Sequence, residues 1–135
     1  MIHNFKTYYF RVRDFINKLF RTEPDPSNDG ICIYISENGF QLKPLERSLF
    51  NPKDHFVYWN SVHKILAYGF DGYLSYHCVL CFIEKNEYVT KVYDNWDNWN
   101  TLYDTILTQF PNFDESKINK IYAGISKPVV CWISS

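Results

Sequence analysis

The residues with the clearest potential for chemistry are two cysteines spaced as Cys78-x-x-Cys81, with His77 immediately before them. A structural zinc site would need both thiolates to converge from a turn, together with a second pair of ligands. The surrounding residues instead predict a strand, in which positions three apart point to opposite faces. No second pair with metal-ligand spacing follows in the sequence. We therefore interpret both cysteines as buried thiols, and we expect no metal site and no cofactor.

The sequence gives little indication of nucleophilic catalysis, because the histidines are dispersed along the chain. A triad of Ser61, His63 and Asp71 can be drawn on paper, but nothing in the spacing places a base beside an exposed, strained nucleophile. Two pairs of acids could in principle serve as a general acid and base, namely Glu84 with Glu87 and Asp94 with Asp97. We expect them at a hairpin tip and in the first turn of a helix, where carboxylates are exposed to water. The sequence therefore predicts that the chain is not an enzyme.

Composition limits the remaining classes of function. The 135 residues are 46% hydrophobic and 19% aromatic, which predicts one globular domain. A formal net charge of −1 excludes the general polyanion binding of highly basic domains, so we expect no nucleic-acid partner. The first twenty residues lack the apolar segment of a signal peptide, and the longest apolar run is Cys78 to Ile83. We expect a cytoplasmic protein with reduced cysteines and no membrane partner.

The elements that must position any site follow from hydrophobic periodicity. Residues 1–22 are predicted to form an amphipathic helical element, because apolar side chains recur there at spacings of three and four. Two prolines and a glycine separate this element from a body at residues 30–135. From Ile31 the apolar period becomes two, and Asn38-Gly39 predicts a hairpin. A helix is predicted at 95–110, capped by Asp94 or Asn95 and ended by Pro111. A shorter helix is predicted at 114–122.

These elements predict an α+β fold with one antiparallel sheet of about six or seven strands. The helix at 95–110 packs on this sheet, and the N-terminal helix docks at one side. The charges are unevenly distributed along the chain. Residues 1–22 carry a net charge of +4, and residues 71–115 carry eight acids against Lys85 and Lys91, a net charge of −6. Such a segment can form a solvated face, or it can offer an acidic surface to a basic partner.

From Val57 onward, the chain resembles a group of small bacterial proteins. The shared features are a tryptophan before a strand, here Trp59, and a helix with the pattern W-x-x-L followed by L-x-x-x-F-P. In this chain the corresponding residues are Trp99-Asn-Thr-Leu102, then Leu107-Thr-Gln-Phe110-Pro111, which has one residue fewer between the leucine and the phenylalanine. In size and in the acidity of one segment, the chain is also similar to immunity proteins of bacterial contact-dependent and polymorphic toxin systems. That resemblance implies a partner, a cognate toxin domain that is often a nuclease.

The leading hypothesis is therefore an immunity protein that occludes a basic toxin surface. Exposed acids would speed association, and aromatic side chains would supply anchoring energy. A non-catalytic module that binds lipid or a small ligand is the alternative. The residues expected to bind the partner are Asp71, Tyr73, Glu84, Glu87, Tyr88, Asp94, Trp96, Asp97 and Asp104.

Overall fold

The computed structural model describes residues 30–45, 54–72 and 75–135. Within them lie seven strands and two α-helices, in an α+β arrangement. The strands are β1 (Ile31–Ile35), β2 (Gly39–Pro44), β3 (Phe56–Tyr58), β4 (Val62–Asp71), β5 (Tyr76–Glu84), β6 (Val89–Tyr93) and β7 (Val129–Ile133), and the helices are α2 (Trp99–Gln109) and α3 (Glu115–Tyr122). The helical element predicted at 1–22 lies outside the described residues.

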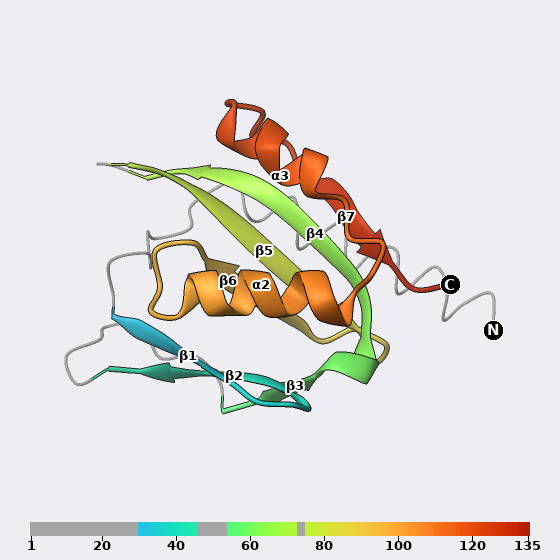
Figure 1. Ribbon diagram of the computed structural model, residues 1–135. Helices are drawn as coiled ribbons and strands as arrows, with labels where there is room; N and C mark the ends of the chain where they lie inside the picture. The colour runs from blue at the N-terminus through green and yellow to red at the C-terminus, as the bar shows by residue number, and fades with distance from the viewer. Residues whose placement is uncertain (1–29, 46–53, 73–74) are drawn as a thin grey trace.

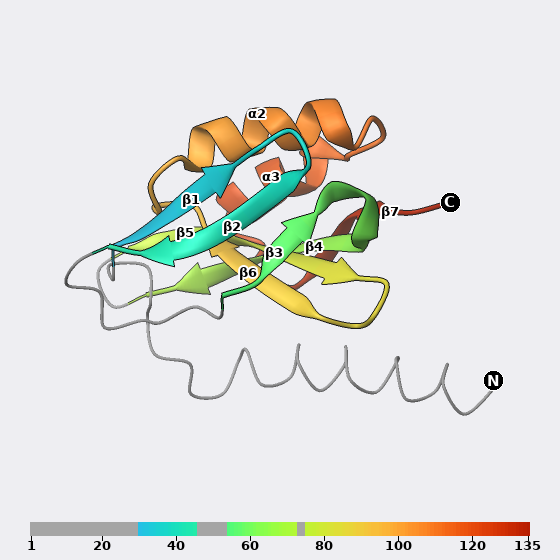
Figure 2. The same cartoon turned by 90° about the horizontal axis from the view of Figure 1, so that it is seen from below.

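The seven strands form two antiparallel sheets rather than the single sheet predicted from the sequence. One sheet has the order β1-β2-β3 and the other has the order β6-β5-β4-β7. The number of strands and their antiparallel pairing agree with the prediction. The division occurs after β3, where a 3-10 turn at Trp59–Ser61 redirects the chain from the first sheet into the second. Figure 2 shows the smaller sheet lying across the larger one.

The burial patterns of the strands agree with their positions in the two sheets. β5 is buried along almost its whole length, as expected for an inner strand that is covered on both faces. β1 instead alternates between buried and more exposed positions, which is the period-two signal of a strand with one covered face. Phe40 of the small sheet packs against Phe82 of β5, with ring centroids 4.8 Å apart. The two sheets therefore share one hydrophobic core.

The two helices pack against different sheets. α2 runs beside β1, and α3 lies along β4 and β7 (Figure 1). α2 buries Leu102 and Ile106 and ends before Pro111, as predicted. Its beginning differs from the prediction, because the helix starts at Trp99 and its N-cap is Asn98. Residues 94–98 form a separate loop, which we call the pre-α2 loop.

Candidate functional site

The pre-α2 loop is held against β1 by main-chain hydrogen bonds. The amide of Ile33 donates to the carbonyl of Asp97 at 3.0 Å, and the amide of Asp97 donates to the carbonyl of Ile31 at 3.0 Å. The side-chain amide of Asn98 donates to the carbonyl of Ile33 at 3.0 Å. Asn98 itself has a left-handed backbone (φ 72°), which asparagine tolerates better than most residues. These contacts fix the loop between the two sheets.

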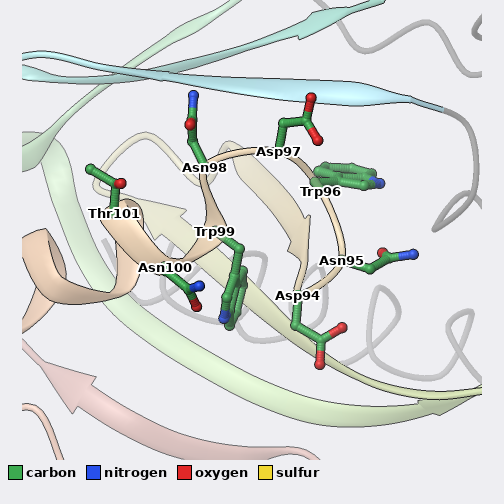
Figure 3. A pocket seen from close by; sticks show the side chains of 8 residues that line it. All are labelled: Asp94, Asn95, Trp96, Asp97, Asn98, Trp99, Asn100 and Thr101. Carbon is green, nitrogen blue, oxygen red and sulfur yellow. The ribbon is translucent and has the colours of Figure 1, made fainter.

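An open depression of about 380 Å³ surrounds the pre-α2 loop and the first turn of α2. Figure 3 shows that Asp97 and Asn98 point toward β1, whereas Asp94, Trp99 and Asn100 point to the other side of the loop. The lining is dominated by carboxylates and carboxamides and contains no basic side chain. Its residues are Asp94, Asn95, Trp96, Asp97, Asn98, Trp99, Asn100 and Thr101.

Asp94 joins three elements through its carboxylate. Oδ1 accepts a hydrogen bond from His77 Nδ1 at 2.8 Å, and Oδ2 accepts from the amide of Cys78 at 2.9 Å. The hydroxyl of Tyr122 at the end of α3 also donates to Oδ2, at 2.7 Å. The sequence predicted Asp94 as a helix cap or a solvated acid, and both predictions are wrong. Its carboxylate instead connects β5, the pre-α2 loop and α3.

Two of the predicted contact residues are buried. Glu84 is only 4% exposed, and its carboxylate accepts hydrogen bonds from His55 Nε2 at 2.6 Å and from the hydroxyl of Ser61 at 2.8 Å. Trp96 is 3% exposed and packs on Tyr93, with ring centroids 5.1 Å apart. The expectation that Glu84 steers a partner from an exposed position and that Trp96 anchors it is therefore wrong. Glu84 belongs to a buried polar network, and Trp96 to the core.

The other predicted residues do not form one surface. Asp71, Asp97 and Asp104 are exposed, whereas Tyr73 lies outside the described residues. Glu87 and Tyr88 lie in the turn that follows β5, beyond Glu84, whereas Asp94 contacts the opposite end of this strand. At about 3.3 Å per residue, β5 separates the two groups by roughly 20–25 Å. The acidic residues thus divide between two ends of the larger sheet.

Aromatic side chains that were not among the predicted partner-binding residues lie near the pre-α2 loop. Trp99 stacks on Tyr103, with centroids 6.2 Å apart and an interplanar angle of 21°. Tyr122 is 52% exposed although its hydroxyl binds Asp94. Burial and the neighbouring Asp94 raise the pKa of Tyr122. The spacing of Trp99 and Tyr103 along a helix could have indicated this pair, but Tyr122 meets Asp94 only through tertiary structure.

The other sequence motifs have structural roles. The triad drawn on paper is not assembled, because His63 Nδ1 lies 3.1 Å from the hydroxyl of Ser134, and Ser61 bonds to Glu84. Cys78 and Cys81 are both buried thiols, as predicted. In the described part of the chain, no group of three or more His, Cys, Asp or Glu residues could hold a metal ion.

The buried thiols lead to a prediction about labelling. Burial raises the pKa of Cys78 and Cys81 and raises that of Cys131 to about 12, so these thiols stay protonated and covered. Only Cys32 is partly exposed. We expect a thiol reagent to label at most Cys32 in the native protein and all four cysteines after denaturation, as counted by mass spectrometry. Rapid native labelling of Cys78 or Cys81 would contradict the buried assignment.

Comparisons with known proteins give no match among protein-family models, curated proteins or solved structures. The resemblance to small bacterial proteins therefore stays a prediction. Among the described helices, none has both the length and the apolar character needed to cross a membrane.

Proposed function

We propose that this protein is an immunity protein that binds a bacterial toxin domain, with a nuclease as the favoured class, and occludes its basic surface. One observation carries the proposal. Residues 92–116, which include α2 and the pre-α2 loop, contain five acids and no Lys, Arg or His, a net charge of −5. A basic cleft that binds nucleic acid has the complementary charge, and such complementarity raises the rate of association.

The positions of the acids support this surface. Asp97 and Asp104 are exposed, and neither forms an ion pair with a described residue. Asn95, Asn98 and Asn100 line the same depression as Asp97 and offer further hydrogen-bonding groups. Half-buried Trp99, stacked on Tyr103, is the best candidate for an aromatic anchor. We call the part of the pre-α2 loop and α2 that carries Asp97, Trp99, Asn100 and Asp104 the acidic α2 surface. Asp97 lies on its β1 side, and Trp99 and Asn100 lie on the other side of the loop.

The attachment of the loop to β1 also favours binding. A loop that is already fixed before binding loses less conformational entropy when a partner docks. The hydrogen bonds between Asp97 and β1 use main-chain atoms, so the Asp97 carboxylate remains available to a partner. Its contribution to association can therefore be tested without removing the bonds that hold the loop.

Charge reversal tests the proposal. The variant Asp97→Lys is expected to slow association with a toxin domain encoded by a neighbouring gene about tenfold at low salt, and to weaken the salt dependence of the rate. The matched control is Glu37→Lys, which makes the same charge change at an exposed position in the β1–β2 turn. Surface plasmon resonance at several salt concentrations measures both rates. Equal rates for the two variants would contradict the acidic α2 surface.

A further inference from the structure

Ser75, His77 and Asp94 form a continuous chain of hydrogen bonds with the histidine in the centre. The hydroxyl of Ser75 lies 2.5 Å from His77 Nε2, and His77 Nδ1 lies 2.8 Å from Asp94 Oδ1. A carboxylate can only accept, so Nδ1 carries the proton in this bond. In neutral histidine, Nε2 is then the acceptor for the Ser75 hydroxyl. This is the order of groups that activates a serine nucleophile.

The surroundings of each group suit that role. Asp94 is held by two further donors, the amide of Cys78 and the hydroxyl of Tyr122, which stabilise its charge and fix its orientation. His77 is only 8% exposed, whereas Ser75 is exposed. The base is therefore largely shielded from water while the hydroxyl next to it is accessible.

A second cluster, which also contains a serine, a histidine and an acid, provides an internal contrast. Ser61 and His55 both bond to Glu84, so the acid lies in the centre and the histidine does not contact the serine. The carbonyl of Tyr58, also 2.8 Å from the Ser61 hydroxyl, is an alternative acceptor for its single proton. The group on the Ser61 hydroxyl is therefore a carboxylate and not an imidazole, so this serine lacks the Ser-His-acid order. The difference between the clusters is the order of the groups, not their composition.

We propose that Ser75, His77 and Asp94 form a nucleophilic relay that cleaves carboxylic acid esters. Ser75 Oγ attacks the carbonyl carbon while His77 Nε2 takes the hydroxyl proton. The bond to the leaving alcohol then breaks, and the imidazolium returns the proton to that alcohol, leaving an acyl-serine. Water, deprotonated by His77 Nε2, then attacks the acyl carbon. The bond between this carbon and Ser75 Oγ breaks, His77 returns the proton to Oγ, and the carboxylic acid is released. This activity needs no protein partner, so it stands apart from the proposed function.

A fluorophosphonate probe tests the relay on the intact chain. Ser75 Oγ would displace fluoride from phosphorus and form a stable bond to it, with the proton leaving through His77. We expect mass spectrometry to find the adduct on the peptide that contains Ser75. The adduct should be lost in Ser75→Ala and reduced at least tenfold in His77→Gln. It should be unchanged in Ser61→Ala, the matched control.

Hydrolysis of p-nitrophenyl acetate provides a second readout, with the same order of variants expected. Circular dichroism and thermal melting establish that each variant is folded under the assay conditions. The proposal is overturned if no adduct forms on Ser75, or if folded His77→Gln reacts as fast as the unchanged protein. A probe adduct shared equally among exposed serines would also overturn it. Ester hydrolysis that depends on Ser75 and His77 would contradict the sequence-based expectation that the chain is not an enzyme.

Discussion

Replacing Asp94 by alanine is expected to lower the free energy of unfolding by about 3 kcal/mol. The substitution leaves three donors without their acceptor: His77 Nδ1, the amide of Cys78 and the hydroxyl of Tyr122. Each buried donor that loses its partner costs on the order of 1–3 kcal/mol, and the exposed Tyr122 can partly recover by bonding to water. Chemical denaturation at neutral pH measures the difference in the free energy of unfolding. We expect the slope of this free energy against denaturant concentration to be unchanged.

Asp97→Ala is the matched control, since it removes the same side chain from an exposed position in the same loop. Its expected cost is below about 0.5 kcal/mol, as for most surface substitutions. Tyr122→Phe should fall between the two, at about 1 kcal/mol, because it removes one hydrogen bond to Asp94. If Asp94→Ala and Asp97→Ala cost the same, Asp94 does not join the three elements as described.

Gly39→Ala is expected to destabilise the protein by about 3 kcal/mol, because the added methyl group has no space. A Cβ at this position would lie 1.9 Å from the carbonyl oxygen of Val57 and 2.7 Å from the ring of Phe56. The oxygen belongs to the backbone of β3, which pairs with β2 at this point. Relief therefore requires the two strands to separate. Thermal and chemical unfolding of the variant measure the loss.

Gly30→Ala separates steric crowding from backbone strain. Gly30 has a φ of +66°, but a Cβ there would meet nothing closer than Leu45 at 3.6 Å. The free energy of unfolding is expected to fall by only about 1 kcal/mol, because alanine must adopt a left-handed backbone conformation there. A larger loss for Gly30→Ala than for Gly39→Ala would contradict the close approach of β2 and β3.

The Asn38-Gly39 hairpin shows how far local sequence rules reach. The alternation of Ile31, Ile33 and Ile35 and the turn after them predicted the paired strands β1 and β2, and this pairing is confirmed. The role of Gly39 was not predictable. Gly39 has no positive φ, and its lack of a side chain is needed because β3, a strand from farther along the chain, lies against it.

The division into two sheets could not be predicted for a similar reason. Each strand carries a local signal of its existence, but the choice of neighbours depends on contacts between residues far apart in the chain. β7 pairs with β4, although both helices lie between them in the sequence. The 3-10 turn that follows β3 also lacks a strong sequence signal. Strand number was therefore predictable, whereas sheet membership was not.

The candidate sites were predicted in part. Asp97 and Asp104 were identified by charge alone and are exposed. Glu84 was assigned to the surface because a hairpin tip was expected there, but its carboxylate is buried and accepts hydrogen bonds from the half-buried His55 and Ser61. For the relay, Ser75 and His77 are two positions apart near the start of a predicted strand, so their shared face was visible in the sequence. Asp94, the third residue of the relay, lies in the pre-α2 loop, so its contact with His77 was not visible in the sequence.

Hydrogen–deuterium exchange of the complex tests the central claim most directly. The protein is measured alone and with a toxin domain encoded by a neighbouring gene, at low salt. The acidic α2 surface predicts that binding slows exchange in residues 94–104, with little change in the turn after β5. A stable complex that leaves residues 94–104 unprotected would contradict the account, as would the absence of any complex.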